Sequence, residues 1–149
     1  MTGIALPSRR LVLAAPALVA LVRPAGATPD RLAQVIREFC GEAEPRPGRV
    51  TLEVPPLVEN GNTVPLSVAV ESPMTEADHV RAIAVFNERN PQPHVLTVRL
   101  GPRAGRAALA TRIRLATSQR LVAVAAMSDG GFWMDSAQVV VTLAACVEG

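Results

Sequence analysis

The two cysteines are the residues that could most directly carry chemistry. Cys146 stands three residues before the C-terminal Gly149, and Cys40 falls in the last turn of a predicted helix. A terminal peptide this short is expected to be mobile, so another protein can reach a thiol on it. In an oxidising compartment the two cysteines can instead form one disulfide. Cys146 is therefore interpreted either as a reactive thiol on a C-terminal arm or as half of a structural bond.

The other chemistry-bearing side chains give weaker signals. His79 and His94, the only histidines, start predicted strands beside polar residues, where a solvated or hydrogen-bonded imidazole is the common case. Soft ligands suit Cu(I), although methionine in a strand usually fills a core. A copper site would require these residues to gather: His79, His94, Met74, Met127, Met134 and Cys146. Zinc spacings, phosphate-binding glycine loops and nucleophilic serine elbows are lacking, so we expect no catalytic residue, metal or cofactor.

Arginines concentrate in residues 99–106, a segment that holds three arginines and two glycines. Arg112 and Arg114 follow on one face of a predicted strand. Such a group can bind an anionic ligand or the carboxylates of a partner. A solvated turn and strand face is the more ordinary interpretation of the same pattern.

Residues 1–27 are typical of an export signal rather than of a fold. Arg9 and Arg10 directly precede an apolar run, and residues 25–27 (Ala-Gly-Ala) offer a small-residue cleavage site, which is the layout of a twin-arginine signal peptide. The run, residues 11–22, contains Pro16 and is shorter than the roughly 20 apolar residues of a membrane-spanning helix. We therefore expect cleavage after Ala27, a periplasmic location and no membrane attachment of the mature chain.

Removal of this segment reverses the net charge. The whole chain carries 15 basic and 13 acidic residues, net +2, and every basic residue is an arginine. Three of the arginines and none of the acids lie in residues 1–27, so the mature chain has 15 − 3 = 12 basic and 13 acidic residues, net about −1. The aromatic residues are Phe39, Phe86, Phe132 and Trp133. Neither a polybasic face nor a stacking set remains, and we expect no nucleic-acid partner.

Residues 28–40 predict one amphipathic helix. Thr28 supplies a capping hydroxyl, Pro29 suits the first turn, and Asp30 lies at the positive end of the helix dipole. Gly41 stands where a left-handed cap ends a helix. The apolar residues that share one helical face are Leu32, Val35, Ile36 and Phe39. We expect this face to pack on the domain or on a partner, and residues 42–48 to form a proline-rich linker.

From Arg49 onward the apolar residues recur at every second position, the period of a strand. Seven strands are predicted, at residues 50–54, 64–70, 79–86, 94–100, 109–115, 121–127 and 137–144. Residues 59–62 contain Asn-Gly and predict a turn. Pro65 cannot donate a ladder hydrogen bond, so its strand is expected to be bulged or at an edge. The strands ending at Phe86 and Ala126 are apolar on both faces and are expected to be central.

These elements predict an all-β protein. Seven short strands separated by turn signals, after one helix, are typical of an immunoglobulin-like antiparallel β-sandwich with one N-terminal helix, and the connections are too short for helical crossovers. The chain divides into a signal peptide at residues 1–27, a sandwich domain at residues 28–144 and a C-terminal cysteine arm at residues 145–149.

Consecutive motifs give the chain a family resemblance. They lie at residues 59–66, 71–79, 86–93, 100–106, 111–115 and 127–133, in the right order and over nearly the whole mature chain. With them the chain resembles SoxY, the sulfur-compound carrier subunit of periplasmic thiosulfate oxidation. The resemblance implies an immunoglobulin-like sandwich, twin-arginine export, pairing with a SoxZ-type subunit, and Cys146 as the residue that holds the substrate covalently on a swinging arm.

The arm itself departs from that of SoxY proper, which ends in Gly-Gly-Cys-Gly-Gly. Ala144 and Ala145 precede Cys146, and Val147 and Glu148 follow it, so the ending resembles that of the SoxY-related proteins named for an Ala-Ala-Cys-Ile-Glu arm. Alanine and valine restrict the backbone and add bulk where SoxY has glycine. The carboxylate of Glu148 is expected to disfavour the thiolate and to repel an anionic adduct.

Two functions of different classes follow from these residues. The first is a periplasmic carrier, not itself an enzyme, that holds a small sulfur-containing group on Cys146 and presents it to partner oxidoreductases. The second is an immunoglobulin-like binding or assembly module stapled by a disulfide between Cys40 and Cys146, without covalent cargo. The number of free thiols in the native protein distinguishes the two.

Overall fold

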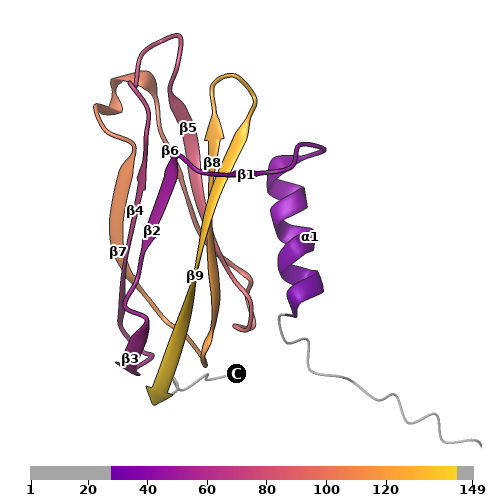
Figure 1. Cartoon of the computed structure of the whole chain (residues 1–149), viewed down its shortest axis with the longest axis vertical. Helices are drawn as coiled ribbons and strands as arrows, with labels where there is room; N and C mark the ends of the chain where they lie inside the picture. Colours follow the sequence, from indigo (N-terminus) through magenta and orange to yellow (C-terminus); the bar gives the residue numbers. More distant parts are fainter. Residues whose placement is uncertain (1–27, 144–149) are drawn as a thin grey trace, which may run out of the picture.

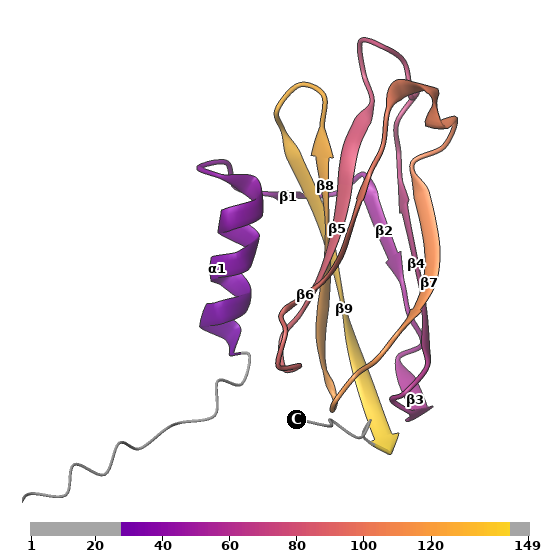
Figure 2. The same cartoon turned by 180° about the vertical axis from the view of Figure 1, so that it is seen from behind.

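The computed structural model describes residues 28–143, which form a helix packed against a two-layered β-sandwich (Figures 1 and 2). In chain order the strands are β1 (Arg46–Pro47), β2 (Val50–Glu53), β3 (Leu57–Asn60), β4 (Val64–Val70), β5 (Val80–Asn87), β6 (His94–Arg99), β7 (Ala108–Ile113), β8 (Gln119–Met127) and β9 (Phe132–Leu143). Within these residues the larger sheet has the order β1-β9-β8-β5-β6, with β3 also paired to β9, and the smaller sheet has the order β2-β4-β7. The all-β, immunoglobulin-like prediction is confirmed.

Helix α1 (Pro29–Cys40) begins and ends at the predicted capping residues. The Thr28 hydroxyl accepts a hydrogen bond from the backbone N–H of Arg31 at 3.3 Å, and Gly41 has a φ of 65°. The apolar face of α1 packs on the outer face of the larger sheet, where Phe39 meets the rings of Phe86 and Phe132 edge-on at centroid distances of 5.9 Å. The helix therefore covers the domain itself.

Strands β5 and β8 form the centre of the larger sheet, as their apolar sequences predict. Their alternate side chains face the smaller sheet on one side and α1 on the other, so nearly every residue of both strands is buried. Ile83 and Ala123 belong to the core between the sheets, whereas Ala84 and Val124 belong to the cluster beneath the helix. Burial on both faces explains why these strands lack a polar alternation.

The smaller sheet has a one-sided pairing at Pro65. Strand β4 is central, because β2 pairs on one side and β7 on the other. The β2 ladder, however, reaches only from Val70 to Ser67 of β4, so at Pro65 the strand is paired to β7 alone, opposite Arg112. The strand is thus an edge at the one position that lacks an N–H donor.

Strands β1 and β3 correct the expectation of a wholly antiparallel sandwich. Strand β1 lies inside the predicted linker at residues 42–48, and β3 overlaps the predicted turn at residues 59–62. Both pair with β9 in parallel, while the long ladders of both sheets are antiparallel. Strand β9 also begins earlier than predicted, because the turn across Gly130, with a φ of 84°, already sets Phe132 opposite Ala126.

Among residues 28–143, no helix has both the length and the apolar character needed to cross a bilayer.

Candidate functional site

The arm predicted to carry Cys146 follows β9, and the structure describes where β9 ends. Leu143, the last described residue, lies opposite Asn60 of β3, and its carbonyl oxygen accepts a hydrogen bond from the Gly61 N–H at 2.9 Å. The Thr142 hydroxyl also contacts the carbonyl oxygen of Glu59 at 3.2 Å. We call the end of β9, residues 140–143, the base of the arm, and pairing with β3 holds it in place. The predicted site residues Ala144, Ala145, Cys146, Val147 and Glu148 lie outside the described residues.

A second set of contacts holds the base of the arm from the β8 side. The Ser118 hydroxyl accepts a hydrogen bond from the Val141 N–H at 2.8 Å. Gln119 is fully buried; its amide nitrogen donates to Asn90 Oδ1 at 2.7 Å, and its Oε1 accepts from the Arg89 N–H at 2.8 Å. The sequence analysis did not identify this network. A polar Thr-Ser-Gln run directly before a strand gives little indication that its glutamine is buried.

Cys40 is a buried free thiol rather than an exposed nucleophile. It closes α1 with 5% of its surface exposed and packs within the cluster between the helix and the larger sheet. Burial raises the pKa of this thiol to about 11. At neutral pH Cys40 is therefore protonated and poorly reactive.

Cys40 also lies far along the sandwich from the base of the arm. In both views the C-terminal end of α1 is level with β1, whereas β9 finishes at the opposite end of the domain (Figures 1 and 2). Strand β1 pairs with Trp133 and Met134, near the start of β9. The nine residue-to-residue steps from Met134 to Leu143 extend over roughly 30 Å at the rise of a β-strand.

The histidines and methionines do not form the copper site considered from the sequence. His79 Nδ1 bonds to the Thr75 carbonyl oxygen at 2.9 Å, and His94 Nε2 bonds to Thr97 Oγ1 at 2.8 Å. Met127 lies in the core between the sheets, whereas Met134 lies on the other face of the larger sheet, beneath the helix. Within the described residues there is likewise no cluster of three His, Cys, Asp or Glu side chains.

The arginine-rich segment at residues 99–106 begins at the last residue of β6 and continues through the turn toward β7. A short 3-10 helix, Pro102–Ala104, shapes it, and Arg99 and Arg103 line a shallow depression with Glu76. Arg112 lies on β7, and Arg114 directly follows the end of this strand at Ile113. The strand predicted at residues 109–115 thus ends two residues earlier in the structure.

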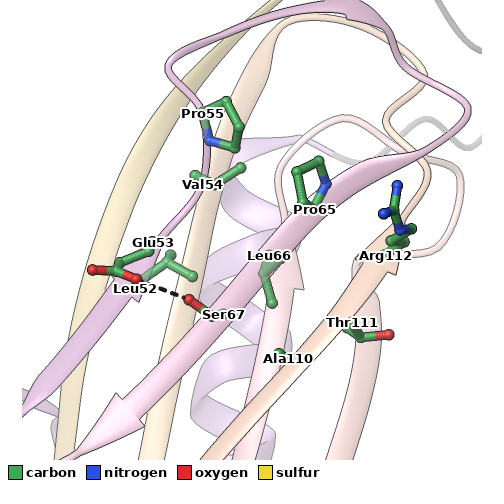
Figure 3. A pocket seen from close by; sticks show the side chains of 10 residues that line it. All are labelled: Leu52, Glu53, Val54, Pro55, Pro65, Leu66, Ser67, Ala110, Thr111 and Arg112. Atoms are coloured by element: carbon green, nitrogen blue, oxygen red, sulfur yellow. Dashed lines mark hydrogen bonds between the residues drawn. The ribbon is translucent and has the colours of Figure 1, made fainter.

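A hollow of about 890 Å³ opens on the smaller sheet (Figure 3). It forms because β2 diverges from β4 after Glu53, whose carboxylate accepts a hydrogen bond from the Ser67 hydroxyl at 3.1 Å. The residues that line it are Leu52, Glu53, Val54, Pro55, Pro65, Leu66, Ser67, Ala110, Thr111 and Arg112. Its lining combines apolar side chains with the polar side chains of Glu53, Ser67, Thr111 and Arg112.

The family model for the sulfur oxidation protein SoxY matches residues 36–146. The chain belongs to the SoxY family. The matched region runs from α1 through the whole sandwich and ends at Cys146. Among solved structures, the sulfur carrier protein SoxY from Chlorobium limicola f thiosulfatophilum is 25% identical, with a TM-score of 0.65; the match covers 76% of this chain and 98% of that one. The resemblance to SoxY inferred from the sequence motifs is thereby confirmed.

Other structures share the fold of this SoxY-family chain. The superoxide reductase (neelaredoxin) from Ignicoccus hospitalis is 20% identical with a TM-score of 0.56, over 77% of this chain and 94% of that one. A putative superoxide reductase from Thermotoga maritima is 23% identical with a TM-score of 0.53, over 66% and 87%. At these identities the likeness is one of architecture. No curated protein matches the chain in sequence.

Proposed function

We propose that this SoxY-family protein is a periplasmic carrier that holds a small sulfur-containing group covalently on Cys146. The protein is not itself an enzyme in this proposal; it presents the group to partner oxidoreductases. Membership of the SoxY family is the observation that carries the proposal, because the matched region includes Cys146 and the similar structure from Chlorobium limicola f thiosulfatophilum is a sulfur carrier protein.

Attachment of a sulfur compound to the Cys146 thiol requires one new sulfur–sulfur bond and a two-electron oxidation. With thiosulfate, the outer sulfur forms a disulfide-type bond to the Cys146 sulfur, the thiol loses its proton, and a partner oxidoreductase removes two electrons. The product is a cysteine S-thiosulfonate. The chain needs no cofactor of its own for this step, because the partner supplies the oxidation.

The described residues support Cys146, rather than Cys40, as the carrying residue. Cys40 is buried in the last turn of α1, and its raised pKa keeps it protonated near neutral pH. Cys146 comes three residues after Leu143, whose strand end is held by β3 and by Ser118 through Val141. A thiol close to a firmly held strand end can be offered to an enzyme without unfolding the domain.

The same geometry disfavours a disulfide between Cys40 and Cys146. Three extended residues span at most about 11 Å, whereas the end of α1 lies level with Met134, roughly 30 Å of β-strand away from Leu143. Disulfide-bonded cysteines have Cα atoms less than about 7 Å apart. The disulfide-stapled module would therefore need β9 or α1 to leave its place.

The proposal also includes a partner subunit and a periplasmic location. A SoxZ-like subunit is the expected permanent partner, since SoxY-family proteins work with one, and twin-arginine export with cleavage after Ala27 would deliver the protein to the periplasm. The intact mass of the periplasmic protein tests the cleavage. Sedimentation with and without the SoxZ-like subunit tests the pairing, and an unchanged monomer in both would contradict it.

Tetrathionate tests the carrying residue directly. A thiolate attacks one of its central sulfurs, the central sulfur–sulfur bond breaks, and thiosulfate leaves with the electron pair, so a cysteine S-thiosulfonate forms without any added oxidant. We expect the native, reduced protein to gain one adduct by intact mass, located on Cys146 by peptide mapping. Cys146→Ser should gain none, and Cys40→Ser should gain one as the wild type does.

The unfolding stability of Cys146→Ser distinguishes the proposed carrier from the disulfide-stapled module. If Cys146 formed a structural disulfide, Cys146→Ser would cost about 2 to 4 kcal/mol, and the native protein would show no free thiol under oxidising conditions. A carrier should instead show the same unfolding midpoint in wild type and Cys146→Ser. A large loss of stability together with the absence of free thiols would overturn the carrier proposal.

A further inference from the structure

Exposed apolar residues gather at the base of the arm. Among the described residues the large hydrophobic side chains with high exposure are Leu57, Val140 and Leu143, at 60%, 48% and 69%. All three belong to the paired strands β3 and β9, and Leu57 lies opposite Val140 in the parallel ladder. Register partners point to the same face of a sheet, so these two side chains stand together in solvent.

This apolar surface extends along the chain into β3. Pro55 and Pro56 are also exposed and directly precede Leu57, and the Pro56 carbonyl oxygen accepts the Val140 N–H at 2.9 Å. We name Pro55, Pro56, Leu57 and Val140 the foot patch. Its backbone is held by the β3–β9 ladder, so the surface is preformed.

One residue of the foot patch, Pro55, also lines the hollow on the smaller sheet. Figure 3 shows its ring beside Val54 at the end of β2, facing the gap toward Pro65. Exposed Gln138 and Thr142, on the same side of β9 as Val140, place polar groups on either side of it. An apolar centre with a polar rim is the ordinary anatomy of a protein contact surface.

We propose that the foot patch is the docking surface for the enzyme that acts on the group carried by Cys146, and that this enzyme presents apolar side chains around its active-site entrance. The inference rests on the proposed carrier function. Its argument is the length of the arm: Cys146 is three residues beyond Leu143 and six beyond Val140, so the thiol lies within about 20 Å of the patch even when the chain is fully extended. An enzyme that binds this thiol in its active site must therefore contact the base of the arm.

The size and place of the patch favour a transient enzyme over a permanent partner. Four residues make a small contact, as in short-lived encounters, whereas permanent interfaces are larger. A subunit seated permanently on the base of so short an arm would also stand between the thiol and the enzyme. A carrier must be released after each transfer, which a small patch allows.

The proposal is tested by comparing two rates of adduct formation on Cys146, one catalysed by an enzyme and one by a chemical reagent alone. The double variant Leu57→Thr/Val140→Thr removes apolar surface while keeping β-branched residues that suit exposed strands. Ala69→Thr is the matched control, because it changes an exposed strand residue of β4 to threonine away from the patch. Each mature protein is incubated with thiosulfate and a periplasmic extract of the source organism, and separately with tetrathionate. The rate of adduct formation on Cys146 is followed by intact mass.

We expect the double variant to be loaded by the extract about tenfold more slowly at low protein concentration, through a raised KM with kcat retained. Loading by tetrathionate should match that of the wild type in all variants, and Ala69→Thr should match it in both reactions. Unchanged extract-catalysed loading of the double variant would overturn the docking proposal while leaving the carrier function standing. A wild-type protein loaded at Cys146 by neither reagent would overturn both.

Two further measurements test whether the foot patch binds a second copy of the chain or the SoxZ-like subunit instead of an enzyme. If the double variant converts a wild-type dimer into a monomer in sedimentation, the patch binds a second copy of the chain. If it loses the SoxZ-like subunit, the patch belongs to that permanent interface. Either result contradicts docking of an enzyme at the foot patch.

Discussion

The carboxylate of Asp135 on β9 accepts a hydrogen bond from the backbone N–H of Leu52 on β2, with an Oδ2–N distance of 2.9 Å. Strand β2 is paired in its sheet on the β4 side alone, among the described residues. The bond therefore satisfies a buried backbone donor on the unpaired side and joins the two sheets near one edge of the sandwich.

We expect Asp135→Ala to lower the free energy of unfolding by about 1 to 3 kcal/mol, because it leaves the Leu52 N–H without its acceptor in a buried place. Asp135→Asn should recover most of the loss, since the amide oxygen can accept the same bond. Urea unfolding of the three proteins measures the difference. Equal stability of Asp135→Ala and the wild type would show that the bond is not needed to join the sheets.

Gln119 should be the most sensitive polar residue near the base of the arm. Gln119→Leu keeps the volume but removes the acceptor of the Arg89 N–H and the donor to Asn90 Oδ1. We expect a loss of about 1 to 3 kcal/mol, because the Arg89 N–H is left without its acceptor, whereas Asn90 Oδ1 still accepts from the Ala116 N–H. Thermal or urea unfolding measures this loss. Gln119→Glu at acidic pH is the control, because a protonated carboxyl can donate and accept in much the same way. Wild-type stability in Gln119→Leu would contradict the network.

Cys40 should make the domain less stable at alkaline pH. The thiol titrates at 9.0 when unfolded and at about 11 when folded, so between these values the folded state binds the extra proton. Stability is therefore complete below pH 9 and falls as the pH rises to about 11. The chain contains neither lysine nor tyrosine, and arginine stays protonated in this range, so few other groups obscure the effect.

Urea unfolding between pH 8 and pH 11 measures this dependence. Cys40→Ala should start from a lower stability, because it leaves a small cavity beneath α1, yet lose less as the pH rises from about 9 to 11. An equal slope in the variant and the wild type would show that the thiol is not what titrates.

The spacing of the apolar residues and the helix-capping residues predicted most of the fold. Thr28 and Gly41 bound α1, and the apolar runs ending at Phe86 and Ala126 identified the two central strands. These features are local, because a cap bonds within one helical turn and a strand buried on both faces must be apolar throughout. The family resemblance was likewise readable, because its motifs are contiguous in sequence.

The short parallel strands could not be predicted in the same way. Strand β1 contains only Arg46 and Pro47, and it pairs with β9 because the chain passes there on its way from α1 to β2. Arg46 then lies over the Trp133 ring at 4.3 Å, a contact between residues far apart in sequence. The foot patch was missed for the same reason, since Leu57 and Val140 become neighbours only through the β3–β9 ladder.

The last prediction concerns Glu148, two residues beyond the proposed carrying thiol. Its carboxylate should disfavour the Cys146 thiolate and repel tetrathionate, which is itself an anion. We expect Glu148→Gln to react with tetrathionate several-fold faster than the wild type at neutral pH and low salt, as measured by the rate of adduct formation. The difference should shrink as the ionic strength rises, because salt screens exposed charges. Glu59→Gln, which removes a carboxylate from the domain near the base of the arm, is the control for a general change in net charge. A Glu148→Gln rate equal to that of the wild type at low salt would show that this carboxylate does not govern the reactivity of the arm.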